Sequence, residues 1–190
     1  ANSDQITDLQ TPYPLIRGKN VGYFKINGIS KDFVKETFVK KTNKRAFIEK
    51  PRIICQQVVN IHKERRVAFS YIEKGFVLGN SCNFITVQEN DQGIDLFTLL
   101  GLFNSPIINW YFKLTSTNNH VNNYEIDSFP IPIGSPYLKQ LGLLTKEYLD
   151  TQNEELLEQI YILSYACFGL SESKQNENDL SVTDNNGWSL

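Results

Sequence analysis

The hydrophobic pattern of the sequence changes once, near residue 95, and this change constrains the fold most strongly. Before it, short segments rich in β-branched and apolar residues are bounded by turn residues, which is typical of strands. After it, apolar residues recur every three or four positions, which is typical of amphipathic helices. Strands followed by helices, without regular alternation, predict the α+β class: a strand-rich lobe, then a helix pair and a C-terminal helical segment.

Three segments of the first half predict strands. Residues 51–60, PRIICQQVVN, predict a strand that begins at Pro51, where the missing N–H is tolerated. Residues 65–80 predict two strands joined by a tight turn at EKG, and residues 82–88 alternate like a further strand. The basic segment 30–50 predicts a short helix and a loop.

The second half predicts helices separated by one unusual loop. A helix is expected to about Asn104, a second from Ser105 to Leu114, and a long acidic helical region over 136–168 that ends at Gly169. Between them, residues 116–133 read STNNHVNNYEIDSFPIPI. Asn and Ser favour turns and Pro removes a backbone donor, so no helix is expected in that stretch.

Charge is segregated along the chain although the net charge is only −2. Residues 17–66 contain 14 Lys and Arg against 4 Asp and Glu, a net charge of +10. Residues 147–190 contain 1 basic residue against 9 acidic ones, a net charge of −8. This asymmetry favours a surface that faces a polyanion and a separate acidic face, although two ordinary solvated faces remain the alternative.

Motifs of catalysis and cofactor binding are missing from the sequence. There is no phosphate-binding P-loop, no dinucleotide fingerprint and no nucleophile elbow, and the two histidines lack metal-ligand spacing. Three widely spaced cysteines predict neither a disulfide framework nor a zinc site; Cys55 and Cys82 are expected to be small core residues. The cysteine pattern favours a reducing cytoplasm, and no apolar run reaches membrane-spanning length. Because no catalytic motif is present, the chain alone is not expected to be an enzyme.

Five stretches, taken in order, carry a resemblance to a known family: RGKNVGYFKI (17–26), KPRIICQQVVN (50–60), the hairpin arm FVLGNSCNFITV (76–87), LLGLFNSPIINWYFK (99–113) and NNHVNNYEIDSFPIPI (118–133). Together they resemble the C-terminal specificity domain of Taq-like adenine-specific DNA methyltransferases, which also occurs in fused type II restriction–modification enzymes. EQIYILSYACFGLSE (158–172) is similar to the helix that closes many members. The resemblance covers roughly residues 15–173.

The resemblance implies a sequence-specific DNA recognition module of a bacterial restriction–modification enzyme. Its partners would be double-stranded DNA and a catalytic methyltransferase or nuclease domain of the same parent chain. In the family, that separate domain binds S-adenosylmethionine and carries an Asn-Pro-Pro-aromatic motif for the flipped adenine; Mg²⁺ is implied where a nuclease is fused. This sequence lacks the motif. No cofactor is therefore expected in this chain.

The expected organisation follows from the resemblance and the composition. Residues 1–14 are a lead-in or a terminus that is not the natural one, and 15–134 form the target recognition domain. Residues 135–170 form a C-terminal helical extension, and 171–190 a weakly ordered tail.

Candidate DNA-binding residues combine cations for phosphates with amides for base edges. They are Arg17, Lys19, Lys41, Lys44, Arg45, Arg52, Gln57, Asn60, Lys63, Arg65, Arg66, Lys113, Asn119 and His120. Because strand side chains alternate, one of Gln56 and Gln57 should face outward. The basic residues could instead form a solvated loop, and the amides of 118–123 could cap neighbouring elements.

A different class of function remains open at this point. The acidic helical region 136–168 could serve a protein-interaction or scaffold module that pairs with a partner helix. Its apolar face would suit docking either on the chain's own lobe or on a second chain. That face comprises Leu141, Leu144, Tyr148, Leu156 and Ile160.

Overall fold

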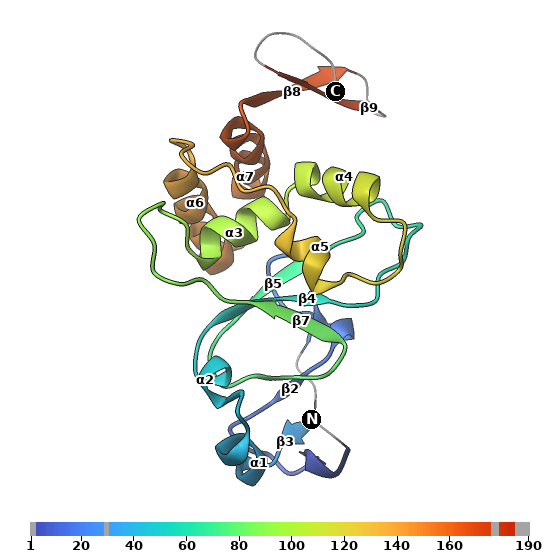
Figure 1. Cartoon of the computed structure of the whole chain (residues 1–190). Helices are drawn as coiled ribbons and strands as arrows, with labels where there is room; N and C mark the ends of the chain where they lie inside the picture. The colour runs from blue at the N-terminus through green and yellow to red at the C-terminus, as the bar shows by residue number, and fades with distance from the viewer. Residues whose placement is uncertain (1–2, 29–30, 176–178, 185–190) are drawn as a thin grey trace. The chain divides into compact units, whose positions relative to one another are not determined.

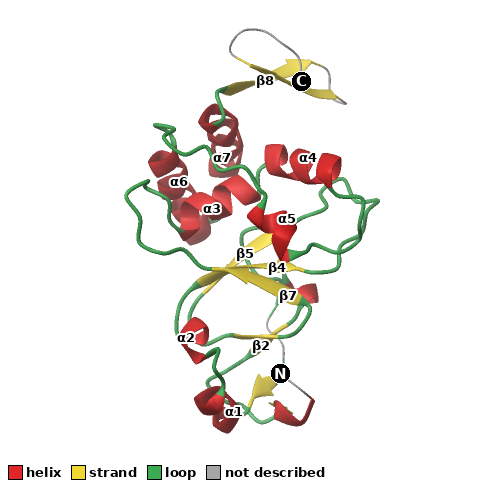
Figure 2. Cartoon of the chain, viewed as in Figure 1, coloured by secondary structure: helices red, strands yellow, loops and turns green. Residues whose placement is uncertain are grey.

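The computed structural model describes residues 3–28, 31–175 and 179–184, and these divide into two compact units. The first, here the sheet unit, comprises Ala1–Val87 and Tyr111–Phe129. The second, here the helical unit, comprises Gln88–Trp110 and Pro130–Leu190. Small sheets lie in the N-terminal part and helices toward the C-terminus (Figure 2), so the expected α+β class is confirmed.

A three-stranded antiparallel sheet forms the centre of the sheet unit (Figure 1). Strand β4 (Arg52–Gln56) lies between β5 (Phe69–Ile72) and β7 (Cys82–Ile85), with Ile54 opposite both Ser70 and Phe84. Four successive residues of β4, from Arg52 to Cys55, are buried, so protein covers both faces of the strand. A strand covered on both faces reads as an apolar run rather than an alternating one, which is the pattern of PRIICQ.

Two small strand pairs also belong to the sheet unit. Strand β1 (Ile6–Thr7) pairs antiparallel with β3 (Phe33–Val34), and β2 (Leu15–Ile16) pairs parallel with β6 (Val77–Leu78). The turn before β6 lies where the sequence predicts it, with Gly75 at φ 96°. The hairpin arm expected over 76–87 is wrong, because β6 and β7 belong to different sheets.

The sheet unit also contains short helices before β4 in the sequence. These are η1 (Ser3–Gln5), η2 (Gly18–Asn20), α1 (Glu36–Lys41) and α2 (Arg45–Ile48). The basic segment thus contains two short helices where one and a loop were expected. Their apolar side chains Val39 and Ile48 pack with Leu15, Val34 and Val77 in one buried cluster.

A further helix, α5 (Asn123–Asp127), corrects the expectation that 116–133 contains none. The main-chain N–H of Asn122 donates to Glu125 Oε2 at 2.8 Å, and the side-chain amide of Asn122 donates to the same oxygen at 3.1 Å. This arrangement stabilises the first turn of a helix. The same Asn that predicts a turn therefore begins a helix.

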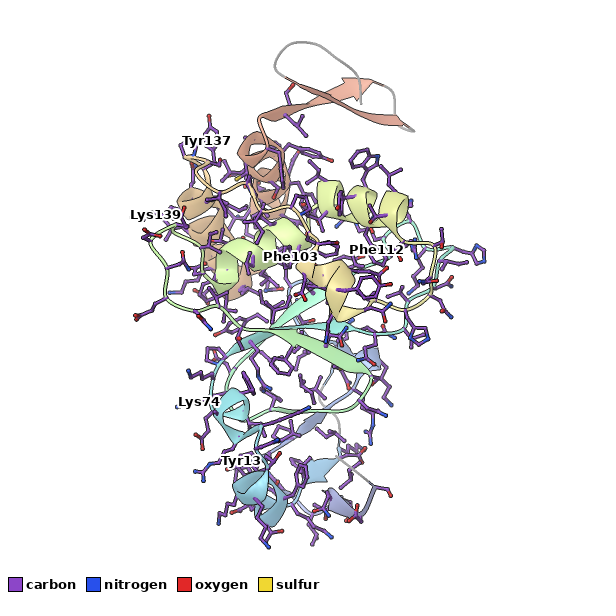
Figure 3. All side chains as sticks on the ribbon, in the orientation of Figure 1. Tyr13, Lys74, Phe103, Phe112, Tyr137 and Lys139 are labelled. Carbon is purple, nitrogen blue, oxygen red and sulfur yellow. The ribbon has the colours of Figure 1, made fainter. Side chains whose placement is uncertain are left out.

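An aromatic cluster joins residues 111–129 to the sheet. The rings of Tyr111 and Phe112, in the second half of α4 (Pro106–Thr115), lie 6.3 and 6.2 Å from the ring of Phe129. That ring lies 6.2 Å from the ring of Phe69 on β5, and every contact is edge to face. Phe112, labelled in Figure 3, is fully buried. The segment after α4 is therefore fixed to the central sheet.

The helical unit contains α3 (Leu96–Phe103), α6 (Leu138–Thr151) and α7 (Glu154–Cys167). Helices α3 and α6 cross closely: a Cβ at Gly142 would lie 2.6 Å from Thr98 Oγ1, and one at Gly101 would meet Thr145 Oγ1. The region 136–168 is thus two helices, separated where Gln152 adopts φ 55° and Asn153 caps α7. Gly169, at φ 72°, ends α7 as expected.

Strands β8 (Leu170–Gln175) and β9 (Asp179–Asp184) pair antiparallel within the expected tail. Residues 176–178 and 185–190 lie outside the described residues, so the weak order of the tail stays a prediction. Within the described ranges, no helix is long and apolar enough to cross a membrane.

Candidate nucleic-acid interface

Two adjacent glutamines at the end of β4 line two different openings of the sheet unit. Gln56 lines one groove and Gln57 another, as the alternation of strand side chains predicts. The first, here the Lys63 groove, is also lined by Tyr23, Asn27, Asn60, Lys63, Glu64, Arg65 and Arg66. The second, here the Phe47 groove, is also lined by Asn43, Lys44, Phe47, Arg52, Asn80, Asn83, Phe84 and Asn123.

The Lys63 groove brings cations and amides together. The guanidinium carbon of Arg65 lies 5.3 Å from the centre of the Tyr23 ring, so the aromatic face restrains the side chain beside the groove. Asn60 and Lys63 are exposed in the turn after β4, where Asn60 Oδ1 accepts a hydrogen bond from the His62 N–H at 2.9 Å. A short polar turn therefore presents an amide and an ammonium group to solvent.

Arg66 is buried and holds a loop from inside. Its Nη1 donates to the carbonyl of Ser116 at 2.6 Å and its Nη2 to the carbonyl of Asn118 at 2.5 Å. Its guanidinium carbon lies 4.8 Å from the centre of the Phe112 ring. The structure thus gives Arg66 an internal role, while its neighbour Arg65 is partly exposed.

The polar loop 117–120 lies directly beside the chain that follows β4. The N–H of Val59 donates to the carbonyl of Asn119 at 2.8 Å, and the N–H of Val121 donates to the carbonyl of Gln57 at 2.7 Å. Asn60 and Asn119 line one small recess together with Ile61. Two segments that are sixty residues apart therefore form one surface.

The side chains of loop 117–120 are exposed and make no hydrogen bond to the described residues. Capping of the next element is done instead by Asn122, through its pairing with Glu125. Nearby, Lys113 Nζ donates to the carbonyl of Glu64 at 3.4 Å. These placements favour the solvent-facing interpretation of the amides over the capping one for residues 117–120.

Seven of the fourteen candidates thus gather on one part of the sheet unit. They are Asn60, Lys63, Arg65, Arg66, Lys113, Asn119 and His120. Gln57, Lys44 and Arg52 line the Phe47 groove instead.

The remaining four candidates lie in neither groove. Arg17 forms an ion pair with Asp32, and Arg45 forms one with Glu49 at 2.6 Å. Lys41 and Lys19 are exposed. Gly18 is buried, and a Cβ there would lie 2.7 Å from the carbonyl oxygen of Ser81. The close approach at this glycine is therefore made within the protein.

The Phe47 groove contains a buried cation. Arg52 is 2% exposed, and its Nη2 donates to the carbonyl of Phe76 at 2.5 Å. Burial lowers the pKa of Arg52 to about 10. Beside it, Gln57 Nε2 donates to Asn83 Oδ1 at 2.7 Å, and Asn83 Nδ2 donates to the carbonyl of Val121 at the same distance.

Groups suited to covalent or metal chemistry are not gathered in the described part of the chain. No cluster of three His, Cys, Asp or Glu residues that could hold a metal occurs there. Burial raises the pKa of Cys55 to about 12 and that of Cys82 to about 11, so both thiols stay protonated at neutral pH. Both are buried in strands, as expected of core residues.

A family model described as the TaqI-like C-terminal specificity domain matches residues 13–131. The chain belongs to this family. No curated protein matches the sequence. The matched residues include all fourteen candidates and both grooves. A TaqI-like specificity domain has a DNA target-recognition role in a restriction–modification enzyme, so DNA is the partner class of this chain.

Three groove residues of this TaqI-like domain escaped the sequence-based selection. Tyr23 lies under Arg65, Asn27 lines the same groove, and Phe47 is 40% exposed in the other. For the two aromatic residues, the sequence offered one signal: each lies within a strongly basic segment. Tyr23 lies between Lys19 and Lys25. Phe47 follows Lys44 and Arg45. Aromatic and cationic residues in alternation are typical of nucleic-acid surfaces.

Proposed function

We propose that this chain is the sequence-specific DNA recognition module of an adenine-specific methyltransferase, which could also be fused to an endonuclease. It would position the target site for a catalytic domain encoded elsewhere in the parent protein. One observation carries the proposal: the Lys63 groove and the loop 117–120 combine cations with exposed amides on one surface. Duplex recognition needs both kinds of group, because phosphate contacts position a protein and base contacts specify the sequence.

Each group on this surface has a role in the proposal. Lys63, Arg65 and Lys113 would bind phosphates, and the restraint of Arg65 by Tyr23 lowers the entropy lost on binding. Gln56, Asn60 and Asn119 would address base edges in the major groove, where an amide pairs well with adenine. The exposed His120 would add a contact from the loop.

Other candidates would extend the footprint along the DNA backbone. Lys19, Lys41 and Lys44 are exposed cations of the same unit. Arg17 and Arg45 would have to share their ion pairs with a phosphate. Arg66 would act indirectly, by holding the loop that carries Asn119.

Cofactors belong to the parent protein in this proposal. S-adenosylmethionine, and Mg²⁺ where a nuclease is fused, would serve the catalytic domain. The sequence of this chain has no Asn-Pro-Pro-aromatic motif, so none of its residues is assigned to either group.

The protein-interaction alternative loses its main support. Leu141, Tyr148, Leu156 and Ile160 of the expected docking face are buried. Helices α3, α6 and α7 pack on one another in the helical unit, so these side chains serve its core.

The proposal is tested by DNA binding of the chain and of its longer parent at several salt concentrations, with the bound duplexes sequenced. We expect an enriched short motif and an affinity that falls steeply with salt. Replacing Lys63 by Ala should reduce the salt slope by about one and weaken all sequences alike. Replacing Asn119 by Ala should cost roughly 1–3 kcal/mol and relax one base position.

The matched control is Lys74→Ala. Lys74, labelled in Figure 3, is an exposed lysine in the turn between β5 and β6 and lines neither groove. The Lys74→Ala substitution removes the same charge as Lys63→Ala and should leave the DNA affinity and the enriched motif unchanged. A flat salt response of the parent, or no enriched motif, would overturn the proposal.

A further inference from the structure

The Phe47 groove is an opening of the sheet unit that shares only Lys44 with the proposed duplex footprint. It has a volume of about 610 Å³, within the range of ligand pockets. Its lining residues include two cations, Lys44 and Arg52, and no Asp or Glu. A pocket with positive charge and no carboxylate in its wall favours an anionic ligand.

Arg52 is a buried cation in the wall of this groove, and no anion of the described residues pairs with it. It is 2% exposed, its Nε makes no hydrogen bond to the described residues, and its one hydrogen bond goes to a neutral carbonyl. Burying a cation without an anion is costly, and a donor left unpaired adds to that cost. An anion in the groove would offset both.

An aromatic face lies next to this charge. The Phe47 ring is 5.2 Å from the Phe84 ring, and the guanidinium carbon of Arg52 is 5.8 Å from that same ring. Phe47 is 40% exposed, so part of its ring is accessible to a ligand in the groove. Exposed aromatic rings beside cations bind nucleobases by stacking, whatever the base.

A polar edge completes the groove. Gln57 donates its Nε2 hydrogen to Asn83, while its Oε1 accepts no hydrogen bond from the described residues. Asn83 is itself fixed through Val121. The Gln57 amide is therefore held in place with one acceptor available to a base.

We propose that the Phe47 groove binds a nucleoside monophosphate, either free or as an unpaired nucleotide of a DNA strand. The phosphate lies toward Lys44 and Arg52, the base stacks on Phe47, and the base edge faces Gln57. This site goes beyond recognition of a duplex and uses neither Lys63 nor Arg65.

The test is titration of the full chain with deoxyadenosine monophosphate, deoxyadenosine and inorganic phosphate, followed by calorimetry and NMR. The monophosphate should bind at least ten-fold more tightly than either fragment. Phe47→Ala should weaken it about ten-fold, as expected for a lost stacking partner. Because Phe47 is partly exposed, this variant should keep the fold, which the NMR spectrum checks directly.

Two further variants separate charge from stacking and from duplex binding. Lys44→Ala should weaken the monophosphate but not deoxyadenosine, whereas Lys63→Ala should change neither. Phe47→Ala should leave duplex affinity unchanged. If duplex binding is normal and the monophosphate does not bind, only this inference fails, and the proposed function stands.

Two results would overturn the inference: inorganic phosphate that binds as tightly as the monophosphate, or a Phe47→Ala variant that binds like the wild type. A short single-stranded oligonucleotide identifies the source of the ligand. Competition with the monophosphate supports an unpaired nucleotide of a strand. Lack of competition overturns that source and supports the free nucleotide.

Discussion

At the scale of single residues, two neighbouring arginines have different surroundings. Arg65 lies over Tyr23 at the Lys63 groove, and Arg66 points inward to the carbonyls of Ser116 and Asn118. In the proposed interface, Arg65 would contact phosphate, whereas Arg66 holds the loop from inside.

Replacing Arg66 by Met tests its internal role. Met keeps most of the buried volume but removes two hydrogen bonds from a charged donor, each worth roughly 1.5–3 kcal/mol. Because the desolvation cost of the buried charge is removed as well, we expect a smaller net fall in the free energy of unfolding, about 2–4 kcal/mol, measured by urea denaturation. Faster amide exchange of Val121 should accompany the loss.

Lys113→Met is the control for that variant. Lys113 is exposed and makes one long hydrogen bond, so its replacement should change the free energy of unfolding by less than about 0.5 kcal/mol. An Arg66→Met variant as stable as the wild type would show that the two carbonyls find other partners.

The buried thiol of Cys55 predicts how stability depends on pH. Burial raises the pKa of Cys55 from 9.0 to about 12. Below pH 9 both states keep the proton; between pH 9 and 12 the unfolded chain loses it and the folded protein does not. The free energy of unfolding should therefore fall as pH rises, by up to about 1.4 kcal/mol per pH unit.

Comparison with Cys55→Ala isolates this contribution, because other groups titrate in the same window. Measured by denaturation from pH 8 to 11, the free energy of unfolding should fall more steeply with pH for the wild type than for Cys55→Ala. Equal slopes would mean that water reaches the thiol.

At the scale of elements, the sequence predicted the long helices and β4 because their hydrophobic periodicity is continuous. It could not predict that β6 pairs with β2, since a two-residue strand has no period and its partner lies about sixty residues away. Nor could it reveal α5, whose five residues depend on the pairing of Asn122 with Glu125 and on packing of Ile126. The candidate surface was predicted as a set of cations and amides; its division into two grooves depends on how the chain folds and so could not be predicted.

The crossing of α3 and α6 gives a prediction at this scale. Gly101→Ala would raise helix propensity by about 1 kcal/mol, yet the added methyl group would meet Thr145 Oγ1 and Leu141. We expect net destabilisation of roughly 1–3 kcal/mol from overpacking, measured by thermal denaturation.

Adding Thr145→Ala to Gly101→Ala removes the group that the new methyl meets. The double variant should therefore recover part of the loss, giving a coupling free energy between the two positions. Strictly additive effects would show that the helices move apart instead.

At the scale of the whole molecule, charge follows the two units. The segment of net charge +10 lies entirely within the sheet unit, and the segment of net charge −8 entirely within the helical unit. A polyanion should therefore be attracted to the first segment and repelled by the second.

Protection of lysines by DNA tests this division. In mass-spectrometric footprinting with an amine reagent, cognate duplex should protect Lys63 and Lys113 by several fold. Lys139 and Lys146, on α6 of the helical unit, should react equally with and without DNA. Protection of α6 in place of the sheet unit would contradict the proposed surface.

The loop 117–120 is held through its main chain. Arg66 donates to the carbonyls of Ser116 and Asn118, and the N–H of Val59 donates to the carbonyl of Asn119. After the loop, the N–H of Val121 donates to the carbonyl of Gln57. The side chains of residues 117–120 take no part in these bonds. Side chains at Thr117, Asn118, Asn119 and His120 can therefore be exchanged without loosening the scaffold that presents them. If the proposed function holds, randomising these four positions in the parent protein should alter its sequence preference at little cost in folding.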